Sequence, residues 1–549
     1  MKPAMSVPPL FPLRRCGPWL LLLLAGLTLL LPGFATLPPT DRDESRFAQA
    51  SRQMHEDGDY LHIRFQDRLR LKKPPGIYWL QSAAAGLAGS GWANPIWPYR
   101  LPSLLGALAA VLATAALGAR MGDGRAGVWA GALLAMTVLL GVEARLAKTD
   151  AVLLAGVVAA QAALWSLYRS HREARPPSLA AVHGFWIAQA AAILVKGPIA
   201  PLVSGLTLLV LGVVDRDGRI WRAVGPRWGL FWLALLVLPW LLALNSATDG
   251  AFLAESLGRD LLAKVGSGQE SHGAPPGTYL MLAPLSLWPT ILLLPPALLW
   301  AWRQRAQAAP RFLLAWALPV WLMFELIPTK LPHYILPTLP ALCLMAALAT
   351  RPGEAATPRW AWRFGVGLWA LGALVWLGVV GILPAWLKTL DGVTLALAGG
   401  LLGAAAMLLY WGRIHTALGL GALVPAGVIM GLLLPHLDGL WPSREVARHL
   451  ERLGVSMPLI AAGYTEPSLV FWTGRETTLV SEGRQAAQLA LAMPGRPVLV
   501  NARTEADFLA AVAARGAKAE RQAEIRAYDL NGSGPLRLTL YQLPGREAP

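Results

Sequence analysis

Long apolar runs recur along almost the whole chain, and they constrain its fold more than any other feature. A helix needs about 20 mainly apolar residues to cross a bilayer. Runs of this kind predict thirteen membrane-spanning helices, at 17–36, 98–119, 124–142, 149–168, 179–196, 198–214, 228–245, 279–302, 311–328, 333–349, 361–383, 394–412 and 416–436. Charged residues make up only 15% of the chain, whereas soluble proteins usually carry about 25%. The sequence therefore predicts a polytopic α-helical membrane protein.

The loops between the runs indicate which side of the membrane each helix end faces. With the N-terminus inside, the inner loops are "ARMGDGRAG", "YRSHREARPPS", "DRDGRIWRAVGPRW", "AWRQRAQAAPR", "RPGEAATPRWAWR" and "YWGRIHT". All are rich in arginine, as inner loops usually are. The stretch 75–90 is short and mixes polar with small residues, so we interpret it as a helix lying on the membrane. The run 17–36 follows Arg14 and Arg15 as in a signal peptide, but it is long enough to span, and we expect an uncleaved first helix.

Residues beyond 437 have a different composition and predict a second fold. The segments "VSMPLIAAG", "RETTLVS", "RPVLVNA" and "LRLTLYQL" read as short strands, and "SREVARHLERLG", "EGRQAAQLALAMPG" and "EADFLAAVAARG" read as amphipathic helices between them. We therefore expect a transmembrane part at 1–436, with interfacial helices in its first outer loop (37–97). A small α/β domain at 437–549 is expected on the outer face.

The net charge of +16 does not indicate a nucleic-acid partner. Lysine and arginine lie mainly in short loops between apolar runs, where topology and anionic lipid explain them. Cys16 and Cys343 lie in or beside apolar runs, so we expect neither a disulfide between them nor a cysteine metal site.

Residues able to carry chemistry gather at the outer ends of the predicted spans. They are Asp43, Glu44, Lys73, Arg145, Lys148, Asp150, Lys196, Glu255, Arg259, Lys330, His333 and Tyr334. A transporter usually holds its ionisable groups near the bilayer midplane, so this distribution favours chemistry on a lipid-borne head group. The sequence has no Walker loop, GxSxG or HExxH motif.

The first outer loop holds the densest group of these residues. In "DESRFAQASRQM" the positions of Phe47, Ala48, Ala50 and Met54 predict a short helix with Asp43 at its N-terminal end, where a carboxylate also serves as a plain helix cap. Lys73 precedes two prolines, which hold it in extended backbone. It can present a charge to a phosphate or simply lie at the membrane interface.

Later outer loops add further candidates. "EARLAKTD" places Arg145, Lys148 and Asp150 within two helical turns, and Lys196 lies at a tight turn. The Gly- and Pro-rich stretch 266–277 is either a lid over a site or a connector. Carboxylates with scattered cations suit transfer from an anionic lipid phosphate, because cations stabilise the departing phosphate while a carboxylate orients or deprotonates the acceptor.

Seven short motifs give the chain a family resemblance. They are "DESRFA", "KKPPGIYWL", "YRLPSLLGA", "ARLAKTD", "LVKGPIAP", "TKLPHYILPTLPAL" and "EPSLVFWTGR". In this order, from about residue 37 to 475, they resemble the GT-C superfamily of integral-membrane glycosyltransferases. Within it, the chain is most similar to the bacterial lipid A aminoarabinose transferases, relatives of the protein O-mannosyltransferases. The resemblance implies the architecture predicted above.

The resemblance also implies roles for individual residues. The catalytic set it implies is Asp43, with Glu44 as motif partner and Asp150 as a second acid. The set implied to hold the donor phosphate is Lys73, Arg259 and Tyr334. Possible substrate contacts are Arg46, Arg145, Lys148, Lys196, Lys330 and His333. The sequence "DRDESRF" makes Asp41 a second candidate acid, although the family pattern favours Asp43.

The implied reaction moves a sugar from undecaprenyl phosphate to an acceptor, with lipid A as the first expectation. The implied location is the bacterial inner membrane, with the site facing the periplasm and the protein acting as a monomer. A divalent cation, Mg²⁺ or Mn²⁺, is a possible cofactor on the carboxylates, although the nearby cations favour metal independence. The alternatives are a protein O-glycosyltransferase, a lipid-linked-sugar flippase and a scaffold that docks through the outer domain.

Overall fold

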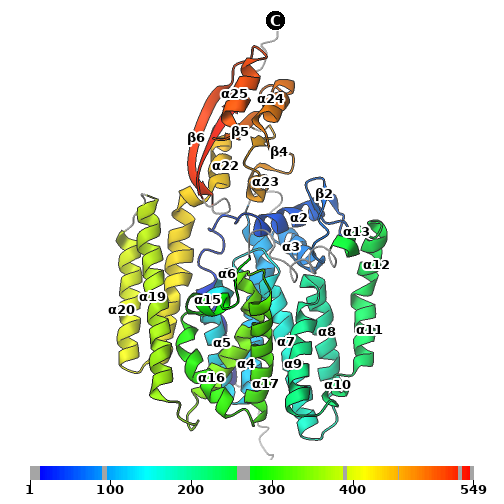
Figure 1. Ribbon diagram of the computed structural model, residues 1–549, viewed down its shortest axis with the longest axis vertical. Helices are drawn as coiled ribbons and strands as arrows, with labels where there is room; N and C mark the ends of the chain where they lie inside the picture. Colours follow the sequence, from blue (N-terminus) through cyan, green and yellow to red (C-terminus); the bar gives the residue numbers. More distant parts are fainter. Residues whose placement is uncertain are drawn as a thin grey trace, which may run out of the picture.

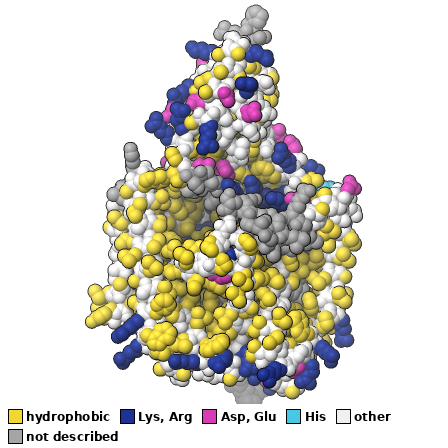
Figure 2. Space-filling model, viewed as in Figure 1, with side chains coloured by type: hydrophobic (Ala, Val, Ile, Leu, Met, Phe, Trp, Pro, Cys, Tyr) yellow, Lys and Arg dark blue, Asp and Glu magenta, His cyan; other side chains and the backbone are white. Residues whose placement is uncertain are grey.

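The computed structural model describes residues 13–89, 95–255, 273–387, 392–455, 457–529 and 534–543. A layer of helices lies side by side, and a smaller domain with a β-sheet stands on one end of it (Figure 1). Lysine and arginine gather along the opposite end, and hydrophobic side chains cover the band between the two ends (Figure 2). This is the appearance expected of a protein whose middle lies in lipid.

Eight helical stretches are each long and apolar enough to cross a membrane. They are α4 (Trp97–Met121), α7 (Asp150–Arg172), α8 (Leu179–Lys196), α17 (Ala308–Leu326), η3 (Pro332–Thr338) with α18 (Leu339–Ala349), α19 (Arg359–Trp386), α20 (Gly392–Tyr410), and α21 (Ile414–Leu423) with η4 (Val424–Leu433) and η5 (Leu434–His436). Each of them lies on a span predicted from the sequence. Two more predicted spans, 17–36 and 198–214, coincide with the shorter apolar helices α1 (Leu13–Leu30) and α9 (Ile199–Val214).

The remaining three predicted spans are helices with a bend. They are α5 (Gly124–Met136) with α6 (Val138–Ala144), bent by 69°, α11 (Pro226–Leu236) with α12 (Leu238–Ala247), bent by 43°, and α15 (Thr278–Ser286) with η2 (Thr290–Leu293) and α16 (Leu294–Arg303), bent by 115°. Pro239 and Pro289 lie at two of the breaks, where proline cannot donate the helical hydrogen bond. The bends bring α6 and α15 to the end of the helical part that carries the sheet domain (Figure 1).

The first outer loop folds into two helices between the helical part and the sheet domain (Figure 1). They are α2 (Asp43–Asp57) and α3 (Gly76–Leu87), with the hairpin β1 (Arg64–Phe65) and β2 (Arg68–Leu69) between them. The predicted apolar positions of α2, Phe47, Ala50 and Met54, pack against Ile77 and Tyr78 of α3. The helix predicted at 75–90 is therefore present as α3.

Residues after 437 form a five-stranded sheet in the order β4-β3-β5-β7-β6. The strands are β3 (Ile460–Ala462), β4 (Thr478–Val480), β5 (Pro497–Asn501), β6 (Glu520–Asp529) and β7 (Gly534–Gln542). The first three pair in parallel, and β7 runs antiparallel between β5 and β6. The helices are α22 (Pro442–Arg452), α23 (Pro467–Thr473), α24 (Gly483–Ala492) and α25 (Glu505–Ala513). The division of the chain at 436 and 437 stays a prediction.

Helix α23 joins the sheet domain to the first outer loop. The Arg52 guanidinium of α2 lies 4.1 Å from the Phe471 ring centroid, and its Nη1 donates to the Phe471 carbonyl at 3.0 Å. The Gln66 side chain donates to the carbonyls of Arg475 at 2.9 Å and Thr477 at 2.7 Å. The sheet domain thus contacts both α2 and the hairpin that follows it. The minor elements α10 (Ile220–Ala223), α13 (Ala251–Leu253) and η6 (Asp438–Leu440) complete the described chain.

Candidate active site

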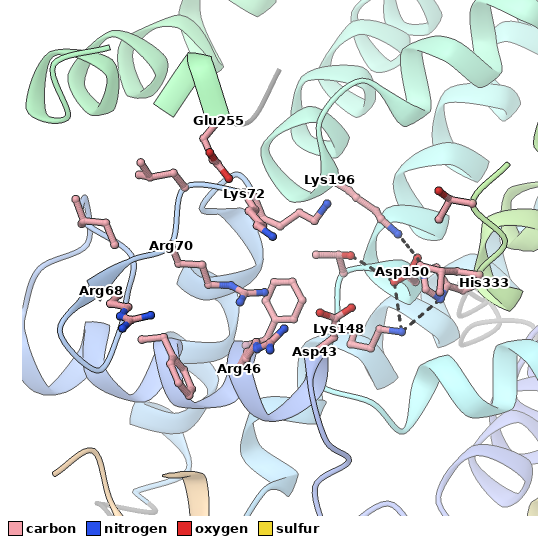
Figure 3. Close-up of a pocket in the computed structure, with 18 of the residues that line it drawn as sticks. Asp43, Arg46, Arg68, Arg70, Lys72, Lys148, Asp150, Lys196, Glu255 and His333 are labelled. Atoms are coloured by element: carbon pink, nitrogen blue, oxygen red, sulfur yellow. Dashed lines mark hydrogen bonds and ion pairs between the residues drawn. The ribbon is translucent and has the colours of Figure 1, made fainter. Parts of the chain in front are cut away.

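A polar cavity of about 750 Å³ lies beside α2, and we call it the chamber. Its walls come from α2, the hairpin and the segment after it, the link between α6 and α7, the end of α8, α13 and η3. The ionisable residues that line it are Asp43, Arg46, Arg68, Arg70, Lys72, Lys73, Lys148, Asp150, Lys196, Glu255 and His333. Cations outnumber carboxylates in this set, and several reach toward the same space (Figure 3). The chamber is therefore built to receive an anion.

Asp43 is the first residue of α2 and faces the chamber (Figure 3). Because the apolar stripe of α2 is buried against α3, the polar N-terminal end of the helix is left on the chamber side. The free amides and the dipole of a helix N-terminus stabilise a carboxylate there. Asp43 is thus an ionisable acid on a rigid element, in a cavity otherwise rich in positive charge.

The cations of the first outer loop are fixed by aromatic neighbours. The Arg70 Nε donates to the buried Tyr78 hydroxyl at 2.8 Å, and the Arg70 guanidinium lies 4.9 Å from the Phe47 ring centroid. Lys73 also lines the chamber, just before the two prolines that lead into α3. Lys73 is the residue that the sequence predicted to bind a phosphate, whereas Arg70 was not predicted.

A buried network of charges forms the wall opposite the first outer loop. The Lys196 ammonium donates to Asp150 Oδ1. The Lys148 Nζ lies 3.3 Å from Glu143 Oε1 and 4.0 Å from Asp150 Oδ2. His333 adds Nε2 at 3.8 Å from Asp150 Oδ1 and Nδ1 at 3.7 Å from Glu143 Oε1. Three segments that are far apart in sequence therefore hold one another through these contacts.

Lys148 keeps its positive charge in this network. Burial disfavours the ammonium form, but the carboxylates of Glu143, Asp150 and Asp43 outweigh burial and hold the pKa of Lys148 above its ordinary value. A lysine with a raised pKa stays protonated at neutral pH. The chamber thus has a fixed positive charge on the side facing Asp43.

The same network contains a set of groups that can bind a metal ion. Glu143, Asp150 and His333 each offer one ligand atom, and these atoms lie within 4.8 Å of one another. Lys148 contacts both carboxylates and Lys196 contacts Asp150. The residue types fit a divalent ion, and the two ammonium groups already supply positive charge at the same oxygens.

An apolar groove of about 370 Å³ continues from the chamber into the helical part, and we call it the first groove. The residues that line both cavities are Lys72, Lys73, Asp150, Lys196, His333 and Tyr334. Beyond them the walls are largely apolar, with Leu153, Ile193, Leu202, Trp240, Leu241, Phe252 and Phe324 among the lining residues. The Lys196 ammonium lies 5.9 Å from the Tyr334 ring centroid. Cations and a tyrosine therefore surround the junction between a polar chamber and an apolar groove.

Glu44, predicted beside Asp43 in the catalytic set, has its carboxylate turned away from the chamber. It is fully buried, and it accepts hydrogen bonds from Arg100 Nε at 2.7 Å, from the Thr40 amide at 2.7 Å and from the Ala147 amide at 3.0 Å. Successive residues of a helix point about 100° apart, so Asp43 and Glu44 face different surroundings. Glu44 is placed to hold the N-terminal end of α2, and its role in the reaction stays a prediction.

Two predicted substrate contacts also point elsewhere. The buried Arg145 guanidinium donates to the carbonyls of Leu29, Pro32 and Gly141, at the end of α1 and within α6. Lys330 donates to the carbonyls of Glu325 and Ile327. Neither lines the chamber, because each satisfies backbone groups left free at helix ends.

The other predicted site residues fall into two groups. Those that line the chamber are Asp43, Arg46, Lys73, Lys148, Asp150, Lys196, His333 and Tyr334. Arg259 lies outside the described residues. The roles assigned to these residues stay predictions.

Sequence reasoning missed two residues that shape the site. Arg100 is fully buried and pairs with Glu44, and Glu143 is almost fully buried beside Lys148. Both lie in largely apolar sequence: Arg100 is the single charge of "PYRLPSLLGA", and Glu143 lies two residues before Arg145 in "VLLGVEARLA". A buried charge needs a partner, so each could have been paired in principle with an opposite charge in another outer loop.

Asp41 also lies close to the site, against the sheet domain. Its Oδ1 is buried and has no hydrogen-bond partner among the described residues. Burial raises the pKa of the Asp41 carboxyl to about 7; a hydrogen bond with Ser468 opposes this shift, and the carboxylates of Glu466 and Asp529 add to it. Asp41 is therefore protonated in the folded protein below about pH 7.

This raised pKa predicts a pH-dependent stability. Between about pH 4 and pH 7 the folded chain keeps the Asp41 proton while the unfolded chain loses it, so stability falls as the pH rises, by about 1.4 kcal/mol per pH unit at most. The Asp41→Asn variant should lose most of this slope, measured as the melting temperature of purified protein from pH 4.5 to pH 8. The exposed Asp67→Asn serves as control. Parallel profiles for wild type and Asp41→Asn would show that Asp41 has an ordinary pKa.

Comparison with known proteins shows what this chain is similar to. The family model for dolichyl-phosphate-mannose-protein mannosyltransferases matches residues 40–249, which include most of the first outer loop and the members of the charge network other than His333. The crystal structure of ArnT from Cupriavidus metallidurans bound to undecaprenyl phosphate superposes with a TM-score of 0.72. The superposition covers 96% of this chain and 98% of the ArnT chain, and the two sequences are 20% identical. The chain is thus similar in fold to ArnT and, over part of its length, similar in sequence to the mannosyltransferase family. The resemblance predicted from the motifs is confirmed, as is a polytopic helical fold with a C-terminal sheet region.

Curated relatives of this chain carry one activity in their names. Two undecaprenyl phosphate-α-4-amino-4-deoxy-L-arabinose arabinosyl transferases of Pseudomonas fluorescens are 30% identical over 337 residues and 29% identical over 485 residues. The alignments cover 60% and 84% of this chain. The chain spans 59% of the first relative and 79% of the second.

Proposed function

We propose that this protein is a glycosyltransferase that moves an aminoarabinose-type sugar from undecaprenyl phosphate to lipid A. The observation that carries the proposal is the junction of the polar chamber with the first groove. A polyprenyl chain fits an apolar groove between spans, and its phosphate then lies among Lys73, Lys196 and Tyr334. The named activity of the relatives and the undecaprenyl phosphate bound by the structural relative support this assignment.

The residues of the chamber suit each step of such a transfer. An acceptor oxygen attacks the anomeric carbon of the sugar, the bond from that carbon to the phosphate oxygen breaks, and undecaprenyl phosphate leaves with the bonding electrons. Lys73 and Lys196 stabilise the charge that develops on the departing phosphate. Asp43 orients the acceptor, and it takes the proton if the acceptor is a hydroxyl. A lipid A phosphate is already anionic and needs orientation alone.

The proposed reaction runs without a divalent ion. The ammonium groups of Lys148 and Lys196 contact the carboxylates that would otherwise bind one. Were Mg²⁺ or Mn²⁺ bound, Glu143, Asp150 and His333 would hold it, and it would supply further positive charge near the phosphate. The proposed location is the inner membrane with the chamber facing the periplasm. The protein is proposed to act as a monomer.

A protein O-glycosyltransferase remains the second candidate, because the matching family model describes protein mannosyltransferases. The deciding experiment uses purified protein with undecaprenyl phosphate-aminoarabinose and either lipid A or a serine- and threonine-rich peptide. Mass spectrometry should show one aminopentose added to lipid A and none to the peptide, with the same rate in the presence of EDTA. Modification of the peptide instead would overturn the assignment of lipid A as the acceptor. Loss of activity in EDTA would overturn the proposal that the reaction needs no divalent ion.

A further inference from the structure

Asp41 lies where the sheet domain meets the segment that leads into α2. The groups of the sheet domain that face it are Ser468 and Glu466 at the start of α23, Asp529 at the end of β6, and Tyr464 after β3. Ser468 forms a hydrogen bond with Asp41, while the Oδ1 atom of Asp41 is buried and has no hydrogen-bond partner among the described residues. The interface therefore contains a carboxyl group with one unsatisfied oxygen.

The surroundings of Asp41 suit a neutral carboxyl group better than a charged one. The charged groups that act on it from the sheet domain are Glu466 and Asp529, and both are acidic. Tyr464 stays neutral, because burial raises the pKa of its hydroxyl. On its own segment Asp41 is followed by Arg42 and Asp43. Burial beside other carboxylates disfavours an ionised carboxyl group, so loss of the Asp41 proton places repulsion in the interface.

The residue that binds Asp41 is tied to the rest of the sheet domain. The Ser443 hydroxyl of α22 lies 2.6 Å from the Ser468 hydroxyl and 2.9 Å from the Tyr464 hydroxyl. Helix α23, which carries Ser468, also contacts α2 through Phe471. A change at Asp41 is therefore felt by the helix that holds α2 in place.

The backbone between Asp41 and Asp43 is held in an unusual conformation. Arg42 has φ 61° and ψ −102°, a region that residues other than glycine rarely adopt. Such a conformation persists only where the structure on both sides holds it. Burial of α2 against α3 holds one side, and the contact of Asp41 with the sheet domain holds the other. Release of Asp41 would let Arg42 relax and would change the direction of Asp43.

We propose that Asp41 is a proton-controlled switch between the sheet domain and the N-terminal end of α2. The sheet domain stays docked while Asp41 carries its proton. Loss of that proton loosens the docking, disorders the start of α2 and slows sugar transfer. The consequence for the transfer rate rests on the proposed function, whereas the change in docking does not.

The direction of the pH dependence follows from the two states of the interface. The docked form holds the Asp41 proton up to about pH 7, whereas an undocked, solvent-exposed aspartate loses it near pH 4. Docking therefore weakens by up to about tenfold per pH unit between pH 4 and pH 7. Above about pH 7 both forms are ionised, and docking stays at its weaker level.

The test measures docking and transfer separately at pH 5 and pH 8. Docking is measured without substrate, as deuterium uptake by the backbone amides of segments 40–54 and 464–477 in the full-length protein. The proteins are wild type, Asp41→Asn, which keeps the side chain neutral, and Asp529→Asn, which removes one of the facing acids. The matched control is Asp507→Asn, which removes an exposed carboxylate of α25 at the far end of the sheet domain (Figure 1).

At pH 5 the uptake should be equal in all four proteins. At pH 8 both segments should exchange at least threefold faster in wild type and Asp507→Asn than in Asp41→Asn, with Asp529→Asn between them. The transfer rate of Asp41→Asn relative to wild type should rise from about one at pH 5 to at least two at pH 8. Other ionisable groups of the chamber affect both proteins alike and cancel in this ratio.

Equal uptake by wild type and Asp41→Asn at pH 8 would overturn the inference, as would a rate ratio that does not change with pH. If Asp41→Asn exchanged faster than wild type already at pH 5, the amide would not replace the protonated carboxyl group. Asp529→Asn then decides, and uptake at pH 8 no slower than in wild type would overturn the inference. Uptake as predicted in a protein that transfers no sugar would support the docking switch and overturn the proposed function.

Discussion

The Asp43→Asn variant should lose about 100-fold or more of the sugar-transfer rate while it folds as well as wild type. Asp43 is the first residue of α2 and lines the chamber. An amide keeps the size of the side chain but removes its charge and its ability to accept a proton. Positioned acid–base groups contribute about 10²- to 10⁴-fold. The measurement is the initial rate of sugar transfer by purified protein at saturating donor.

The matched control for this variant is Asp41→Asn, two residues earlier. Asp41 is the second candidate acid of the sequence, and its carboxyl packs against the sheet domain. We expect Asp41→Asn to keep most of the transfer rate at pH 7. If the two variants exchanged their effects, Asp41 would be the acid of the reaction. If neither lowered the rate, the acceptor would be activated by another group.

The largest loss of stability should come from Arg100→Met, at about 3–5 kcal/mol, because it leaves the buried Glu44 carboxylate without its charged partner. Arg100 also donates from Nη1 to the carbonyls of Phe34 at 2.8 Å and Leu37 at 2.9 Å. The variant therefore loosens the connection from α1 to α2 as well. Thermal unfolding of purified protein in detergent measures the effect, together with the yield of folded protein.

Two further variants show whether the stranded Glu44 charge causes the loss of stability in Arg100→Met. Arg120→Met removes an exposed arginine at the other end of α4 and should change stability by about 0.5 kcal/mol or less. Adding Glu44→Gln to Arg100→Met removes the stranded charge and should recover part of the stability. If Arg100→Met melted like Arg120→Met, the pair would contribute little to stability, and Glu44 would be free to act in the reaction.

The positions of the membrane-spanning helices along the chain could be predicted well, because an apolar run must reach a certain length to cross the bilayer. The same holds for α2, whose stripe of Phe47, Ala50 and Met54 buries itself against α3. Once that stripe is buried, Asp43 is left at an exposed helix end. These features depend on local pattern, so the sequence alone defined them.

The direction of individual side chains could not be predicted in the same way. Arg145 and Lys148 are three residues apart in one short outer link, yet Arg145 binds carbonyl groups of α1 and Lys148 lines the chamber. Their directions depend on how the link between α6 and α7 turns and on where α1 ends. Both are properties of packing between distant segments.

The edge strand β6 was missed for a related reason. Its sequence, "ERQAEIRAYD", is mostly charged or polar, and only Ile525 is buried. A strand at the edge of a sheet keeps one side paired and the other side in water, so it lacks the apolar alternation by which strands are recognised. Helix α23 was missed as well, although it provides the contacts that hold α2.

The measurement that tests the central claim most directly is the purified transfer reaction with undecaprenyl phosphate-aminoarabinose and lipid A, run with wild type and with Asp43→Asn. The account predicts that wild type adds one aminopentose to lipid A and that Asp43→Asn, equally folded, adds it about 100-fold more slowly or not at all. Unmodified lipid A after prolonged incubation with folded wild type, or equal rates for the two proteins, would contradict it.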